Sequence, residues 1–234
     1  MKLDYLTNLN ESQEEAVLHL NGPLLIVAGA GSGKTRVLTA RIAHIVKQHK
    51  AFPNQVLAVT FTNKAAKEMN ARVNKLLTKN KSFGLTVSTF HNLGLRIIRS
   101  EVKTLGFKNG FSILDQEDCR NLLKELMIRH SDLDNELLDT LLTTISSWKN
   151  SLLEPNQILN SSQSNGEKSI ALLYAEYQRS LKAYNAVDFD DLIMIPALLF
   201  RTHSEILAKW RSKIRYLLVD EYQDTNLSQY ELIR

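Results

Sequence analysis

Apolar positions in the first ninety residues follow two alternating patterns. Segments typical of buried strands occur at 24–28, 56–61 and 85–90, and the first of these runs is continuously apolar. Apolar side chains at helical spacing occupy three segments between and after these runs, at 34–47, 65–77 and 93–102. Strands that alternate with helices predict a mostly parallel sheet covered on both faces.

The alternation stops near residue 92. From there to residue 186 the apolar positions follow helical spacing, and no run predicts a buried strand. The polar segment 160–166 is typical of a loop, and residues 170–184 are typical of a helix. This stretch is long enough to pack as a subdomain of its own.

A buried apolar run returns at 216–221, and a further helix is predicted from about Ser228. The simplest arrangement is an α/β core that is split in two. We therefore expect a core of residues 1–88 and 188–234, interrupted by an all-helical insertion at 89–187.

Composition excludes several classes of protein. Of 234 residues, 44% are hydrophobic and 23% are charged, which is ordinary for a soluble globular protein and excludes a disordered tail or fibrous repeat. The apolar run 24–28, like every other in the chain, is far shorter than the roughly 20 residues that a membrane-spanning helix needs. The N-terminal residues do not resemble a signal peptide. A single cysteine, Cys119, excludes a disulfide framework and fits a cytoplasmic protein.

The net charge of +4 hides an asymmetry. Residues 1–110 hold 16 Lys and Arg against 6 Asp and Glu, whereas residues 111–234 hold 13 against 19. A basic region can meet polyphosphate or nucleic acid. Charge alone favours the plainer explanation, a solvated lysine-rich face.

A glycine-rich segment follows the first predicted strand and precedes the first long helix. It matches the phosphate-loop pattern, with Ala in place of the first Gly. Glycines let backbone N–H groups surround phosphate oxygens, and the helix N-terminus favours the same anion. The plainer alternative is a glycine turn, but the flanking strand and helix favour a nucleotide site. The residues expected to bind it are Ala28, Gly29, Ala30, Gly31, Ser32, Gly33, Lys34 and Thr35.

Within this loop, Lys34 is expected to reach the β- and γ-phosphates, and the Thr35 hydroxyl to ligate Mg²⁺. The partner carboxylates should follow another buried strand, and Asp220 and Glu221 do so. Asp220 would hold Mg²⁺, and Glu221 would polarise the attacking water. Alone, this pair would be interpreted as a solvated acidic turn; beside a phosphate loop it favours hydrolysis of ATP.

Several longer motifs lie along the chain, in the segments 9–13, 60–66, 88–91, 188–192, 214–218 and 220–226. These motifs resemble those of the superfamily 1A DNA helicases, the Rep/UvrD/PcrA group. The resemblance runs from residue 3 to the last residue. A further motif at 145–150, Ile-Ser-Ser-Trp-Lys-Asn, resembles the Rep branch in particular.

The resemblance implies a RecA-like core and gives roles to matching positions. Gln13 would read the adenine edge, because an amide can donate and accept together. Gln223 would sense the γ-phosphate. Arg36 would lie along the nucleotide or serve as a helix-surface arginine, and the sequence does not favour either.

The same resemblance implies contacts with single-stranded DNA. Phe61 would stack on an unpaired base, an interaction worth about 1–3 kcal/mol that is independent of base sequence. The alternative is that Phe61 packs in the core, as phenylalanine usually does. The other positions expected to contact phosphates or sugars are Thr60, Asn63, Lys64, Thr89 and His91.

The implied activity is ATP-driven 3′-to-5′ movement on DNA, in replication, restart or repair and with proteins of those processes as partners. In the family, a second RecA-like domain supplies arginines to the γ-phosphate. We expect the present residues to lack that domain, to bind nucleotide weakly and to hydrolyse it poorly, because such an arginine is worth about 10³–10⁵ in rate. A different P-loop enzyme, such as a kinase, and a non-catalytic binding module stay as alternatives.

A small carboxylate cluster precedes the apolar run 192–199. Asp188, Asp190 and Asp191 could form a nuclease metal site, but no further ligand lies at useful spacing. We favour helix capping by Asp188 or Asp190. Cys119 and Trp148 are interpreted as packing residues.

Overall fold

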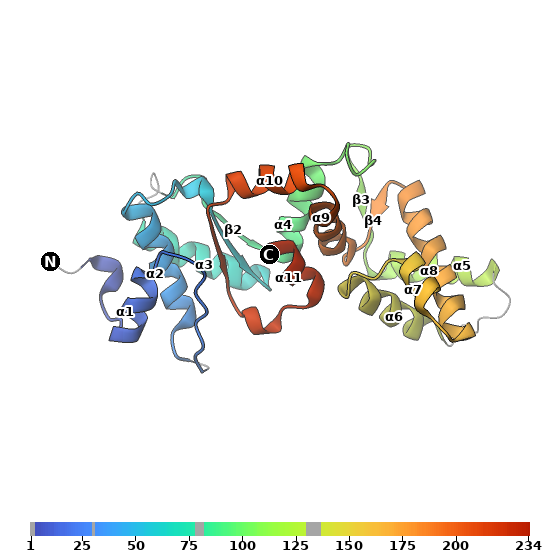
Figure 1. The fold of residues 1–234 in the computed structure, drawn as a ribbon, viewed down its shortest axis with the longest axis horizontal. Coiled ribbons are helices and arrows are strands. Elements are labelled where there is room, and N and C mark those ends of the chain that lie inside the picture. Colours follow the sequence, from blue (N-terminus) through green and yellow to red (C-terminus); the bar gives the residue numbers. More distant parts are fainter. Residues whose placement is uncertain (1–2, 30, 78–81, 130–136) are drawn as a thin grey trace. The chain divides into compact units, whose positions relative to one another are not determined.

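The computed structural model describes residues 3–29, 31–77, 82–129 and 137–234. The chain divides into two compact units (Figure 1). The first unit comprises Met1–Phe90 and Glu205–Asp224, and the second comprises His91–Ser204 and Thr225–Arg234. Within the described ranges, no helix has the length and apolarity needed to cross a membrane.

The first unit is built on a parallel sheet of three strands, β1 (Val56–Thr60), β2 (Thr86–Thr89) and β5 (Tyr216–Val219). Their order is β2-β1-β5, so β1 is central, and all five of its residues are buried. The register pairs Thr60 with Thr89 across the ladder. The predicted α/β class with a parallel sheet is thus confirmed, as are these three strands.

Helices α1 (Glu11–Leu18), α2 (Lys34–Lys47) and α3 (Asn63–Leu76) belong to the first unit, and most of α10 (Ser204–Lys213) does too. Asn10 begins α1 with a capping box, and the Thr62 hydroxyl accepts from Ala65 N to cap α3. α1 packs on α2, α2 on α3, and α3 on β1 and β2 (Figure 1). The short 3-10 turns are η1 (Asp4–Leu6), η2 (Pro53–Gln55) and η5 (Tyr222–Asp224).

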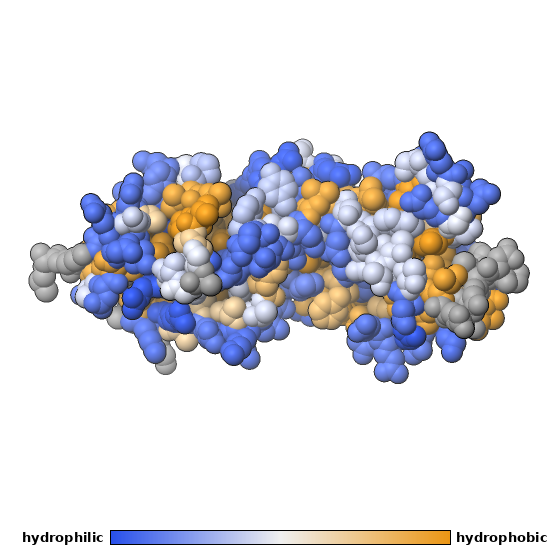
Figure 2. Space-filling view, turned by 90° about the horizontal axis from the view of Figure 1, so that it is seen from below, coloured by the Kyte–Doolittle hydropathy of each residue, from blue (hydrophilic) through white to orange (hydrophobic). Residues whose placement is uncertain are grey.

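The prediction of a buried strand at 24–28 is wrong. Residues 23–29 lie in no strand, and the side chains of Leu25 and Val27 are 69% and 87% exposed. An extended apolar run becomes a strand only where a neighbouring strand supplies hydrogen bonds. Among the described residues, β5 pairs with β1 alone, so the sheet ends there. Exposed hydrophobic side chains occur elsewhere in the chain too, and Figure 2 shows hydrophobic residues among the hydrophilic ones on one face.

The second unit is mainly helical. Its core gathers apolar side chains of α5, α6 and α8, and includes Cys119 and, at its edge, Trp148, so the packing role predicted for both is confirmed. α5 packs on α6 and α8, α7 on α8, and α11 on α9 and α6 (Figure 1). Its helices are α4 (Phe90–Ser100, from its second residue), α5 (Gln116–Arg129), α6 (Leu138–Asn150), α7 (Pro155–Ser161), α8 (Asn165–Ala183), α9 (Asp191–Thr202) and α11 (Leu227–Ile233).

Two predictions for this region need correction. The stretch is not all-helical, because β3 (Ser112–Ile113) pairs in parallel with β4 (Ala186–Val187), and two residues are too few to produce a periodic signal. The predicted loop at 160–166 is shorter, since α7 ends at Ser161 and α8 begins at Asn165. Packing of α7 on α8 outweighs the low helix propensity of these polar residues.

The two units do not follow the predicted division into 1–88, 89–187 and 188–234. Residues 188–204 and 225–234 pack with the helical unit rather than with the sheet. One crossing within the second unit needs a glycine: a Cβ on Gly94 would lie 1.6 Å from the Leu192 carbonyl oxygen. α4 and α9 approach each other closely at that point, as only glycine permits.

Candidate functional site

The glycine-rich loop leads directly into α2. Gly33 is the N-cap, in the left-handed conformation at φ 87°, and a Cβ there would lie 3.1 Å from the Gln13 amide nitrogen. The loop closes on the Gly29 carbonyl oxygen, which accepts from Ser32 N at 3.3 Å and from Ser32 Oγ at 2.6 Å. Ala28, Gly29, Gly31 and Ser32 are exposed, as a ligand-binding loop requires, whereas Ala30 lies outside the described residues.

The side chain of Lys34, the first residue of α2, folds back onto this loop. Its Nζ donates to the Ala28 carbonyl oxygen at 3.0 Å and lies 4.0 Å from Glu221 Oε2. Thr35 follows it, half-buried in the first turn of the helix. The structure therefore brings the loop lysine and the acidic motif together, although more than 180 residues separate them in the chain.

Asp220 and Glu221 follow the last residue of β5. The backbone N–H of Asp220 donates to Val59 O at 2.9 Å, which extends the pairing of β5 with β1. Burial and the neighbouring Glu221 carboxylate raise the pKa of Asp220, and the nearby charges of Lys34 and Arg72 only partly offset this. Arg72, on α3, had no individual role predicted, because its nearness to Asp220 depends on how α3 packs.

Glu221 adopts a left-handed backbone conformation, with φ 51°. Such a conformation is uncommon for a non-glycine residue and is concentrated at functional sites. Gln223 donates its amide Nε2 to Glu221 Oε2 at 2.5 Å. Two of the predicted catalytic side chains are therefore in direct contact.

The donor set fits a magnesium ion held jointly with phosphate. Within the described part of the chain, no group of three or more His, Cys, Asp or Glu side chains could hold a metal ion alone. Mg²⁺ usually takes one or two carboxylates and completes its shell with water and substrate phosphates. Burial and the charge of Glu221 raise the pKa of Asp220, and a bound cation would oppose that shift.

The side chains of Gln13 and Arg36 lie beside the loop. The Gln13 side chain donates from Nε2 to Ser32 O at 2.9 Å, and its Oε1 accepts from Asn10 N at 3.0 Å. Its amide is therefore engaged with the chain on both sides. Arg36 donates from Nη1 to Asn8 O at 3.3 Å.

The residues predicted to contact DNA fall at the carboxyl ends of β1 and β2. Thr60 and Thr89 are paired across the ladder, and both are buried. Asn63 and Lys64, in the first turn of α3, are exposed. The Phe61 ring is half-buried and packs on Phe90, with ring centroids 5.3 Å apart. Solvent therefore reaches Asn63, Lys64 and part of Phe61, but not Thr60 and Thr89.

His91 belongs to the second unit, unlike the other predicted DNA contacts. Its ring packs on Phe189 with centroids 5.3 Å apart. Burial lowers the pKa of His91, and the Asp190 carboxylate opposes that shift. Burial therefore favours the neutral form of the ring.

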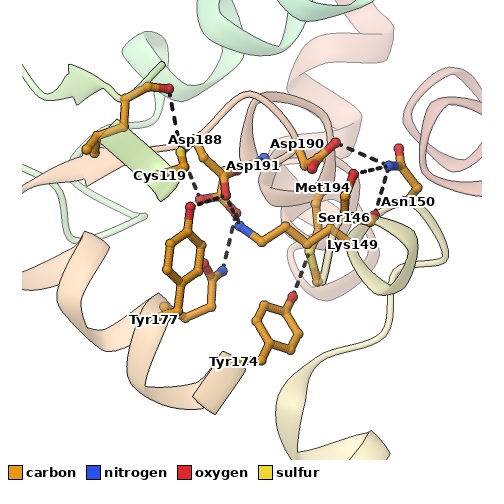
Figure 3. Close-up of polar contacts among 12 residues, drawn as sticks. Cys119, Ser146, Lys149, Asn150, Tyr174, Tyr177, Asp188, Asp190, Asp191 and Met194 are labelled. Atoms are coloured by element: carbon orange, nitrogen blue, oxygen red, sulfur yellow. Dashed lines mark hydrogen bonds and ion pairs between the residues drawn. The ribbon is translucent and has the colours of Figure 1, made fainter. Parts of the chain in front are cut away.

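Asp188 and Asp191 both contact the Lys149 ammonium, whereas Asp190 accepts from Asn150 Nδ2 (Figure 3). Asp188 Oδ1 accepts from Asp191 N at 2.9 Å, so its predicted capping contact is confirmed. Asp190 is the N-cap of α9 by position, but its side chain makes no capping bond, so Asp188 is the one of the two predicted candidates that caps. The partner, Lys149, carries no sequence signal that distinguishes it from a surface lysine.

The chain is similar to known proteins along almost its whole length. Residues 9–234 match the family described as "UvrD/REP helicase N-terminal domain". The chain is 49% identical over 226 residues to the ATP-dependent DNA helicase Rep of Escherichia coli K12, covering 97% of this chain and 34% of that protein. It is 44% identical over 236 residues to the ATP-dependent DNA helicase PcrA of Leuconostoc citreum, covering 100% and 31%. The chain spans about a third of the length of these curated relatives.

Proposed function

Because the chain belongs to the UvrD/REP helicase N-terminal domain family, we propose that it is the ATP- and single-stranded-DNA-binding portion of an ATP-dependent 3′-to-5′ DNA helicase. The observation that carries the proposal is the approach of Lys34 Nζ to Glu221 Oε2, at 4.0 Å. This approach places the start of α2 beside the end of β5. A nucleotide phosphate bound there needs a cation, a metal ligand and a base, and these two segments carry such residues.

Each group at this site has a distinct task. Lys34 binds the β- and γ-phosphates together with the backbone N–H groups of residues 28–35. Thr35 and Asp220 hold Mg²⁺, which, when bound, neutralises charge on the phosphates. Glu221 orients the attacking water and Gln223 senses the γ-phosphate. Gln13 and Arg36 line the side of the loop on which we place the rest of the nucleotide.

For DNA we propose a surface at the carboxyl ends of β1 and β2. Phe61 supplies a ring on which an unpaired base stacks, and Lys64 and Asn63 contact the backbone phosphates. Thr60 and Thr89 shape this edge from within, since both are buried. His91, in the second unit, is proposed as a DNA contact in its own right.

We assign the first unit to a RecA-like core and the helices of the second to an insertion subdomain. Turnover would require arginines from a second RecA-like domain, so we expect the 234 residues alone to bind nucleotide weakly and hydrolyse it poorly. We place the protein in the cytoplasm, acting in replication, restart or repair with proteins of those processes.

Calorimetric titration with MgATP tests the nucleotide site. Lys34→Ala should weaken binding at least tenfold, because a charge-assisted hydrogen bond contributes about 1.5–3 kcal/mol and each 1.4 kcal/mol is a factor of ten. Lys168→Met, at an exposed position on α8, is the control and should bind as the unaltered chain does.

Fluorescence anisotropy with a labelled oligo-dT strand tests the DNA surface. Phe61→Ala should weaken binding and leave the salt dependence unchanged, whereas Lys64→Ala should reduce the salt slope by about one phosphate contact. DNA affinity without any nucleotide site would favour a non-catalytic module. Activity on a small molecule without DNA would favour another P-loop enzyme, and robust DNA-stimulated ATP turnover that Lys34→Ala abolishes would contradict the expected impairment.

A further inference from the structure

Two phenylalanine side chains of the first unit are open to solvent at the amino ends of its strands. Phe83 and Phe52 are 87% and 75% exposed, and they are the two most exposed of the eight phenylalanines in the chain. Phe61, by contrast, is half-buried and follows the carboxyl end of β1. A single exposed apolar side chain is ordinary, but exposed rings that lie near one another indicate an interaction surface.

Contacts within the first unit bring together the three segments that lead into the strands. The turn η2 directly precedes β1. On one side of this turn, a Cβ on Gly84 would lie 3.1 Å from Asn54 Cβ. On the other side, Arg215 N donates to Gln55 O at 2.8 Å. Because the strand order is β2-β1-β5 and adjacent strands lie about 4.8 Å apart, the backbones entering β2 and β5 are about 10 Å apart, with the turn between them.

The charged side chains of these segments are all positive. Residues 47–55, 82–85 and 211–215 contain five Lys and Arg and no Asp or Glu. Lys50, which precedes the turn, and Arg215, which precedes β5, are both exposed. Neither forms an ion pair with any residue that the structure describes. Cations that no carboxylate neutralises attract an anionic partner.

Exposed rings beside cations fit a single strand of nucleic acid better than an acidic peptide. Each nucleotide carries a flat base that can stack on an aromatic ring, and a phosphate that a cation can contact. Stacking needs only the face of a ring, whereas the anchoring side chain of a peptide fills a desolvated pocket. Phe52 and Phe83 present open rings at turns, which is the arrangement that stacking requires.

We propose that Phe52, Phe83, Lys50 and Arg215 form a second binding surface for single-stranded nucleic acid, the amino-end surface. The two rings stack on bases, and the two cations contact phosphates. The five residues of β1, about 16 Å of strand, separate this surface from Phe61. The proposal is therefore independent of the nucleotide site and of the DNA surface proposed at the carboxyl ends of β1 and β2.

Fluorescence anisotropy with a short labelled oligo-dT strand tests the amino-end surface on the whole chain. The measurements use a Phe61→Ala background, in which the carboxyl-end surface contributes least. There, Phe83→Ala and Phe52→Ala should each weaken the remaining affinity about five- to hundredfold, the effect of one lost stacking contact. Arg215→Gln and Lys50→Gln should each reduce the slope of log K against log salt by about 0.7, because each removes one phosphate contact on a single strand.

Two exposed side chains of the second unit supply the controls. Tyr184→Ala removes an exposed ring and Lys168→Gln removes an exposed cation, and neither should change the affinity or the salt slope. Thermal melting should be the same for every variant and its background, because each replaced side chain is exposed.

Two results would overturn the proposal directly. One is an unchanged affinity in Phe52→Ala and Phe83→Ala, and the other is an unchanged salt slope in both cation variants. A peptide of alternating Asp and Phe tests the other class of partner. If Phe83→Ala loses that peptide and keeps its affinity for oligo-dT, the surface serves an acidic protein segment and the proposal falls.

The background variant separates this proposal from the earlier one. If Phe61→Ala alone removes all affinity for oligo-dT, the carboxyl-end surface stands and the amino-end surface falls. If Phe61→Ala changes nothing and Phe83→Ala removes the affinity, the amino-end surface stands and the carboxyl-end surface falls.

Discussion

Each compact unit holds a lysine near two acidic side chains, in opposite environments. In the first, the Lys34 and Glu221 side chains are 25% and 43% exposed and lie 4.0 Å apart, with Asp220 beside Glu221. In the second, Lys149 is fully buried and contacts Asp188 and Asp191 directly. The same residue types form an open cluster in one unit and a closed cluster in the other.

The difference shows what separates a candidate site from a structural ion cluster. In the closed cluster, burial lowers the Lys149 pKa, but the Asp191 and Asp188 carboxylates outweigh this and hold that pKa above its ordinary value. In the open cluster, the pKa of Asp220 stays raised, because Lys34 and Arg72 do not compensate for burial and Glu221. A cation with phosphate would complete the open cluster, whereas the carboxylates of the closed one are buried against Lys149 Nζ, where a ligand does not reach them.

The largest effect on this contrast is expected from replacing each lysine in turn. Lys149→Met should destabilise the second unit by about 3–5 kcal/mol, because two buried carboxylates lose their cation. Lys34→Met should change the free energy of unfolding by less than about 0.5 kcal/mol, since its pairing is loose and exposed. Denaturant unfolding can be followed by Trp148 in a Trp210→Phe background for the second unit, and by Trp210 in a Trp148→Phe background for the first.

The triple variant Lys149→Met, Asp188→Asn and Asp191→Asn is the control for the first result. Removing all three charges together should recover much of the lost stability, because no charge stays buried without a partner. Equal losses for Lys34→Met and Lys149→Met would show that the open cluster is structural too.

A smaller effect is expected from pH. Burial raises the pKa of Asp191 from 3.8 to about 6. Between these values the folded chain holds a proton that the unfolded chain releases, so the contribution of Asp191 to stability falls as pH rises. The slope is at most about 1.4 kcal/mol per pH unit and levels off above the folded pKa.

Unfolding of the unaltered chain and of Asp191→Asn from pH 4.5 to 7 measures this contribution. The stability of the unaltered chain, relative to the variant, should fall as pH rises through this window and then stay level. A difference that rises with pH, or does not change, would mean that the cluster keeps Asp191 charged throughout.

The smallest effect concerns Asp220. Asp220→Asn removes a carboxylate whose pKa is raised by burial and by Glu221, so the first unit should be as stable as before or more stable by up to about 1 kcal/mol, an effect reduced by solvent screening. The same change should abolish the Mg²⁺ dependence of ATP-analogue binding. Trp210 fluorescence and titrations with and without Mg²⁺ give the two measurements; a marked loss of stability would assign Asp220 a structural role.

Much of the fold was predictable where the signal is local. α2 was expected at 34–47, and the structure has Lys34–Lys47. β1, β2 and β5 were expected from their sequence patterns, although only the central strand, β1, is buried along its whole length. The run at 24–28 has the same pattern but lies in no strand, since an apolar run does not specify which strand will pair with it.

The candidate site was predictable in its members but not in its arrangement. The spacing of glycines and Lys34, and the acidic pair after an apolar run, selected these residues from the sequence. The bond of Gln223 to Glu221, the left-handed conformation of Glu221 and the nearness of Arg72 had no local signal. They depend on how a turn and a helix meet the end of β5.

The sequence by itself therefore determined α2, the central strand β1, the phosphate loop and the family, because each has a signal in local periodicity or in a short contiguous motif. Only the tertiary structure decided which lysine is buried. Lys149 and its carboxylates are 39 and 42 residues apart, so their meeting depends on the packing of α6 against α9. It likewise decided that one cluster of a lysine and two acids is closed and the other open, because burial and distance are properties of the packed chain.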